Sequence, residues 1–204
     1  MKYSIITACT VALLATACSG GSSDVKKLVI MSSGKISAAG KDSKEINFEP
    51  GTQHNEMEFQ YVGTEPVKIT VKSKDGDKTY DLPESGAYVL NLKGSDTLIG
   101  SIVNYGDAGI PPSITTEKLQ HMVDSAQQLI MGLNASDEAR TYFLVPGAVK
   151  KVSKNYSSRL IGPFNGIPNT VEVDKDGKAP EVYKFNTTKQ KREELYKLVE
   201  RMNK

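Results

Sequence analysis

The chain carries two histidines, and each has carboxylates at a spacing that could bind a divalent cation or support acid–base chemistry. The first group is His54, Glu56 and Glu58, which occupy alternate positions and would point to one face of a strand. The neighbouring Phe59 and Tyr61 favour another arrangement, in which His54 lies in a turn before an edge strand. Both glutamates would then face water, and we expect no metal ion there.

The second histidine lies in a segment with helical periodicity. Glu117, His121 and Asp124 follow one another at i, i+4 and i+7, which places them on one helix face. Their order lacks the His-Glu-x-x-His pattern of zinc hydrolases. We favour a solvated face with ordinary ion pairs. A hydrolase that uses His121 or His54 with these carboxylates remains an alternative.

No other segment predicts a reaction. Residues 174–177, Asp-Lys-Asp-Gly, begin like a calcium loop, but Lys175 and Lys178 oppose a cation and Pro180 interrupts the pattern. The sequence contains no G-x-S-x-G elbow, phosphate-binding glycine loop or dinucleotide fingerprint. We therefore predict no catalytic residue, no metal site and no cofactor.

The most unusual loop spans residues 159–169. Two glycines and two prolines surround Phe164 and Ile167, which favours a stiff surface loop with apolar side chains at its tip. Such a loop could bind a protein partner, because a rigid aromatic side chain loses little conformational entropy on binding. We favour the alternative, a crossover that packs Phe164 and Ile167 into the core.

A basic stretch precedes this loop and consists of Lys150, Lys151, Lys154 and Arg159, with Tyr156 among them. Contact with phosphate or an anionic lipid is one interpretation. A solvated surface is favoured because the net charge of the whole chain is only +2. The same balance gives no indication of nucleic-acid binding.

The N-terminal residues have the pattern of an export signal. Met1-Lys2 supplies a positive charge, residues 5–17 carry no charge, and small residues precede Cys18. This stretch is thirteen residues long, whereas a transmembrane helix needs about 20 apolar residues. We expect residues 1–17 to be a signal peptide.

The position of Cys18 resembles the lipobox of bacterial lipoproteins. Membership of that family implies that the Cys18 sulfur receives a diacylglyceryl group, that the chain is cut before it, and that the new terminus is acylated. Residues 18–26 would be the lipidated cysteine and a flexible tether. By the same resemblance, Ser19 implies the outer membrane, with the protein facing the periplasm. Plain secretion after cleavage before Ser19 or Ser22 is the alternative, since Ala15 stands where the family more often has leucine.

The remaining composition describes an ordinary folded body. Charged residues make up 25% of the chain and mean hydropathy is −0.37. Cys9 lies in the signal, so Cys18 is the one cysteine of the mature protein. Disulfides within the body and thiol chemistry are therefore excluded.

The fold class is predicted as α+β. Residues 27–106 contain seven short alternating segments separated by turn residues such as Pro50-Gly51 and Asp75-Gly76. They predict an antiparallel β-sandwich, immunoglobulin-like in outline. Residues 112–204 predict a smaller α+β unit with two helices.

Both helices have sequence signals. The first is expected from Thr115 or Thr116 to about Leu133, with an apolar stripe that packs on a sheet. That stripe consists of Leu119, Met122, Ala126, Leu129 and Leu133. The last helix begins at Thr187, whose capping box is completed by Gln190. Residues 170–173 and 182–185 predict a hairpin around residues 174–177.

These expectations combine into a lipid-anchored envelope lipoprotein with a non-enzymatic interaction or accessory role. It would contact the membrane through its N-terminal lipid and a protein partner through its body. An envelope inhibitor or immunity protein and the histidine-dependent hydrolase are the alternatives.

Overall fold

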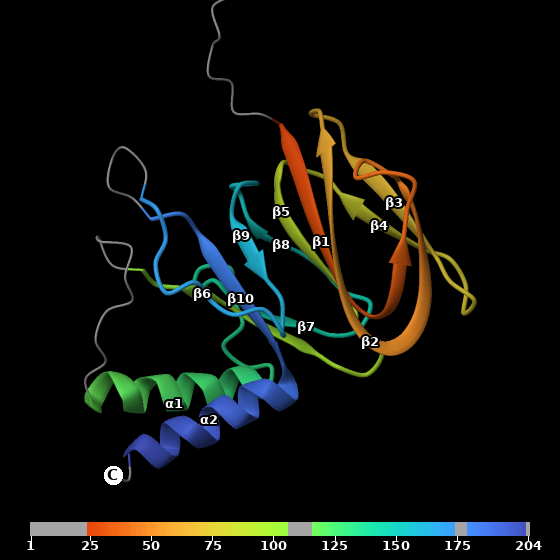
Figure 1. Cartoon of the computed structure of the whole chain (residues 1–204). Helices are drawn as coiled ribbons and strands as arrows, with labels where there is room; N and C mark the ends of the chain where they lie inside the picture. Colours follow the sequence, from red (N-terminus) through yellow and green to blue (C-terminus); the bar gives the residue numbers. More distant parts are fainter. Residues whose placement is uncertain (1–23, 106–115, 174–178, 203–204) are drawn as a thin grey trace, which may run out of the picture.

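The computed structural model describes residues 24–105, 116–173 and 179–202 and shows a sheet-rich molecule with two helices (Figure 1). Sheet A has the strand order β4-β3-β2-β1-β5-β8, and sheet B the order β7-β6-β10-β9. The strands of sheet A are β1 (Val25–Ser37), β2 (Glu45–Val62), β3 (Val67–Lys72), β4 (Lys78–Leu82), β5 (Gly86–Leu92) and β8 (Val149–Ser153). Those of sheet B are β6 (Leu98–Val103), β7 (Thr141–Leu144), β9 (Arg159–Ile161) and β10 (Val182–Thr187). The helices are α1 (Thr116–Ile130) and α2 (Thr188–Met202).

Sheet A is centred on β1, which is buried on both faces. Leu28 and Ile30 point to one side, and Val29 and Met31 point to the other, toward sheet B. β1 pairs in parallel with β5, which is buried along its whole length. Strands covered on both faces carry continuous apolar runs because neither face meets water.

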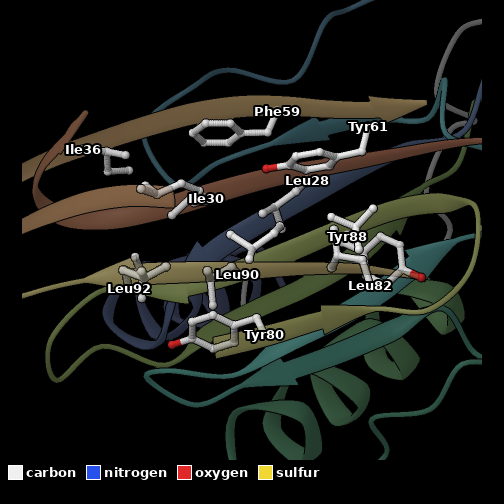
Figure 2. Packing of buried hydrophobic residues seen from close by; sticks show 14 residues of the cluster. Leu28, Ile30, Ile36, Phe59, Tyr61, Tyr80, Leu82, Tyr88, Leu90 and Leu92 are labelled. Atoms are coloured by element: carbon white, nitrogen blue, oxygen red, sulfur yellow. The ribbon is translucent and has the colours of Figure 1, made fainter. Parts of the chain in front are cut away.

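The first face of sheet A curls round an interior of its own, which makes the sheet barrel-like. Aromatic and branched side chains from β1 and β2 face those from β4 and β5 across this interior (Figure 2). Phe59, Leu82 and Leu90 are almost completely buried there. This packing holds the long strand β2 against β1.

The second face of sheet A packs on sheet B. Val29 and Val89 meet Tyr142, Tyr183 and Phe185 from sheet B in one buried cluster. A side chain at Gly100 of β6 would overlap the Phe185 ring, so only glycine fits opposite it. The two sheets are therefore joined by a shared core.

The expected turn at Pro50-Gly51 is wrong, because both residues lie within the continuous strand β2. The pairing of β1 with β2 shifts between Ser33, opposite His54, and Gly34, opposite Pro50. Gly34 has φ 126° and approaches the backbone of β2 too closely for any side chain. A bulge thus absorbs the turn residues and bends the strand pair without ending it.

The antiparallel arrangement expected for residues 27–106 is wrong in part, because β1 and β5, and β2 and β3, pair in parallel. In the second predicted unit, β9 and β10 pair in parallel as well. Strand pairing crosses the predicted boundary between residues 27–106 and 112–204 as well, because β5 pairs with β8 and β6 pairs with β7 and β10. Both sheets therefore draw strands from both predicted units.

The two helices lie side by side next to sheet B (Figure 1). In α1 the buried side chains are Val123, Ala126 and Leu129, whereas Met122 and Leu133 of the predicted stripe are exposed. The expected helix end near Leu133 is wrong, because α1 ends at Ile130 and Leu133 lies beyond it. In the part of the chain that the structure describes, neither helix has the length and apolarity to cross a bilayer.

The capping box of α2 is confirmed. The Gln190 amide N–H donates to Thr187 Oγ1 at 3.2 Å, and the Thr187 N–H donates to Gln190 Oε1 at 3.0 Å. The predicted hairpin is wrong, since residues 170–173 form no strand. Both edges of β10 are already paired, with β6 and β9, so no edge remains for another strand. Residues 174–177, the expected turn, lie outside the described residues.

Candidate functional site

The loop between β9 and the segment leading to β10 exposes the two apolar residues that its sequence singles out. Phe164 is 63% exposed and Ile167 is 42% exposed. The core interpretation of these side chains is therefore wrong. We call residues 162–168 the Phe164 loop, and the surrounding contacts explain how it keeps a fixed shape.

Lys184 of β10 holds the beginning of this loop. Its ammonium donates to the backbone oxygens of Gly162 at 2.5 Å, Asn165 at 2.7 Å and Pro163 at 3.2 Å. Burial lowers the pKa of Lys184, although the nearby Glu194 and Glu56 act in the opposite direction. Three carbonyls round one cation satisfy backbone acceptors that a loop would otherwise leave to water.

Two further hydrogen bonds fix the loop at its ends. The Gln190 side-chain amide donates to the Pro163 oxygen at 2.9 Å, so the residue that caps α2 also holds the loop. The Tyr105 hydroxyl donates to the Pro168 oxygen at 2.6 Å. Sheet B, α2 and the segment after β6 therefore all support the Phe164 loop.

His54 and Glu56 of β2 support the loop from sheet A. The structure places His54 within a strand, so the expectation of a turn there is wrong. His54 Nε2 lies 2.6 Å from Glu56 Oε1, and both side chains are about four-fifths buried, at 19% exposed. The Asn165 side-chain amide donates to Glu56 Oε2 at 3.0 Å. Glu56 thus does not face water as expected, whereas Glu58 is exposed and accepts from Gln60.

Lys93, which follows β5, completes the support. Its Nζ lies 3.1 Å from His54 Nδ1 and 5.4 Å from the centre of the Phe164 ring. The Phe164 and His54 rings are 4.6 Å apart, tilted by 53°. Lys93 is only 2% exposed, and this burial lowers its pKa although Asp96 and Glu56 raise it. One face of the Phe164 ring thus rests on a buried imidazole and a cation.

This arrangement engages both nitrogens of His54. Nε2 lies within hydrogen-bond distance of Glu56, and Nδ1 lies within hydrogen-bond distance of Lys93. His54 therefore contacts Glu56 through Nε2 and Lys93 through Nδ1. Among the described residues, no group of three metal-binding side chains comes together.

Gly162 allows the loop to approach the Glu56 carboxylate closely. A Cβ at this position would overlap the Glu56 carboxylate. Gly166 at the tip has open space around it. The two glycines of the predicted loop therefore differ, because Gly162 lies close to Glu56 and Gly166 has free space around it.

The second histidine group is not brought together with the first. His121 and Asp124 are exposed on α1, where His121 contacts Ser125 at 3.4 Å and Asp124 accepts from Gln120 at 2.9 Å. Glu117 is exposed in the first turn of the same helix. Cys18 and the rest of residues 1–23 lie outside the described residues.

The sequence indicated the loop but not the residues that hold it. Lys93, Lys184 and Tyr105 lie far from the loop along the chain, and a lone lysine in a strand carries no signal of a role. Comparison of the chain with protein-family models, with curated proteins and with solved structures gave no match.

Proposed function

We propose that this protein is a lipid-anchored envelope lipoprotein that binds a protein partner through Phe164 and Ile167. One observation carries the proposal: the Phe164 ring is 63% exposed although the loop beneath it is held by six side-chain hydrogen bonds, from Lys184, Gln190, Tyr105 and Asn165. Exposing an aromatic ring on a fixed support costs free energy, and a partner recovers it by burying the ring.

The anchor rests on the lipobox-like pattern that ends at Cys18. The resemblance supports attachment to the outer membrane with the body facing the periplasm. Labelling cells with radioactive palmitate tests the anchor. We expect Cys18→Ala to abolish the label and Cys9→Ala, which alters the apolar part of the signal, to retain it. Label that persists in Cys18→Ala would contradict the anchor.

A photo-crosslinking side chain at position 164 tests the partner. In intact membranes we expect one cross-linked adduct that disappears when Ile167 is also changed to Ala. The matched control is position 196, because Tyr196 of α2 is similarly aromatic and 70% exposed. Equal adducts from both positions would mean nonspecific capture and would contradict a specific role of the loop.

The supports of Phe164 favour a non-enzymatic role. Both nitrogens of His54 are engaged, and Phe164 lies on its ring, so the histidine-dependent hydrolase gains no support at this position. An inhibitor or immunity protein would bind its target through the same exposed loop. Identifying the cross-linked partner would distinguish this function from that of an accessory protein. The two sheets pack on each other through one shared core, which supports a β-sandwich. We propose further that this sandwich is immunoglobulin-like in outline.

A further inference from the structure

A second polar site lies where β7, β8 and β10 come together, away from the Phe164 loop. It is an open cavity of about 520 Å³, a volume within the range of small-molecule sites. Its lining includes Arg140, Tyr142 and three lysines of the basic stretch, Lys150, Lys151 and Lys154. The sequence favoured a solvated surface for all three lysines, whereas the fold gathers them round one hollow.

A fixed carboxylate forms one wall of this cavity. Glu181 Oε2 accepts hydrogen bonds from the hydroxyls of Ser153, Ser158 (2.9 Å) and Tyr183 (3.4 Å). Burial alone would raise the pKa of Glu181, but the hydroxyl donors and the charge of Arg140 outweigh it and lower the pKa below its usual value. Glu181 is therefore a rigid anion at neutral pH.

Arg140 is held by this carboxylate through one atom. Its Nη1 lies 3.2 Å from Glu181 Oε1, and the side chain remains 46% exposed at the cavity. A guanidinium carries five N–H donors, so most of them are available to a ligand. The Arg140 backbone has φ 52°, a left-handed conformation that side-chain-bearing residues rarely adopt and that concentrates at ligand sites.

The charges round the cavity do not cancel. Lys150 pairs with Asp137 at 2.9 Å, Lys151 pairs with Glu84 at 2.7 Å, and Arg140 pairs with Glu181. Within residues 24–105, 116–173 and 179–202, Lys154 forms no ion pair. The cavity therefore has one positive charge in excess, beside a guanidinium with unused donors.

We propose that this cavity binds the oxyanion group of a small ligand, a phosphate or a carboxylate, through the guanidinium of Arg140. The planar donor pair of a guanidinium matches two oxygens of either group, and Glu181 holds the guanidinium in place for this contact. Lys154 adds charge at the rim. This site is independent of the Phe164 loop, so either proposal can fail while the other stands.

Isothermal titration of the full, detergent-solubilised protein with inorganic phosphate, and separately with acetate, tests the site. Sodium chloride keeps the ionic strength constant. We expect saturable binding of at least one anion in the millimolar range, and the anion that binds distinguishes a phosphate ligand from a carboxylate ligand. Arg140→Gln should weaken this binding at least about tenfold. Lys68→Gln, which removes a charge from β3 outside the cavity, should leave it unchanged.

Two conservative variants keep the test decisive if Arg140→Gln fails to fold. Arg140→Lys preserves the charge but not the paired donors and should still weaken binding several-fold, and Lys154→Gln should weaken it less. Melting curves establish that each variant is folded. Binding of neither anion to the wild-type protein, or equal affinity in folded Arg140→Gln or Arg140→Lys, would overturn the proposal.

Discussion

The phenyl ring of Phe164 packs against the imidazole of His54, with ring centroids 4.6 Å apart, although the two residues are far apart in the sequence. His54 belongs to sheet A, whereas the loop that carries Phe164 is tied to sheet B through Lys184. The contact therefore joins the two sheets at the surface, outside their shared core. A change on either side of it should alter the loop.

Replacing Gly162 by alanine should loosen the loop. The added Cβ would overlap the Glu56 carboxylate, so the loop or Glu56 must move and the Asn165–Glu56 hydrogen bond is lost. We expect a loss of about 1–3 kcal/mol in the free energy of unfolding, measured with urea. Gly166→Ala is the matched control, because open space surrounds that position and its effect should be small. Equal destabilisation by both changes would contradict the close approach at Gly162.

Replacing Lys184 by methionine should increase the mobility of the same loop. The change keeps an apolar side chain of similar length but removes the donors to three carbonyls. We expect faster amide hydrogen exchange across residues 162–168 and a loss of about 1–3 kcal/mol in stability. Lys68→Met, at an exposed position of β3, should change neither quantity. Unchanged exchange in the loop of Lys184→Met would show that the remaining contacts suffice.

Glu181 should make stability depend on pH. Its pKa is lower in the folded protein than the usual 4.5, so the unfolded chain binds a proton more readily. Its contribution is therefore fully present above that value and is lost as pH falls through the folded-state pKa. The difference in unfolding free energy between wild type and Glu181→Gln should be largest near neutral pH and shrink in acid.

Urea unfolding of both proteins from neutral pH down to strongly acidic pH measures this difference. Glu65→Gln removes an exposed carboxylate between β2 and β3 and controls for the change in net charge. A difference that stays constant as the pH falls would mean that Glu181 contributes by packing and not by its charge.

Local periodicity predicted individual strands well. Residues 67–72, one of the alternating segments within residues 27–106, coincide with β3. Prediction failed where the outcome depends on a distant partner. Pro50 and Gly51 read as a turn, but β2 continues through them with a bulge opposite Ser33 and Gly34 of β1. Residues 170–173 read as half of a hairpin, but β6 and β9 already occupy both edges of β10.

The candidate site, too, was predicted only where local sequence determines the structure. Glycine and proline content marked the loop and its two apolar residues, because turn chemistry is local. Whether Phe164 packs in the core or lies at the surface depends on contacts with Lys93, His54 and Lys184. These residues are distant in the sequence, so their spacing does not indicate that they contact the loop. The pairing of Glu181 with Arg140 was invisible for the same reason.

The central position of β1 has a mechanical consequence. This strand, the first among the described residues, pairs with β2 along its whole length and with β5 over residues 26–32. A pull applied at Asp24 along the strand would load both ladders in shear, so many hydrogen bonds would resist at once, whereas an edge strand would peel away bond by bond. If the chain is tethered at its N-terminus, tension reaches the body at its most strongly held strand.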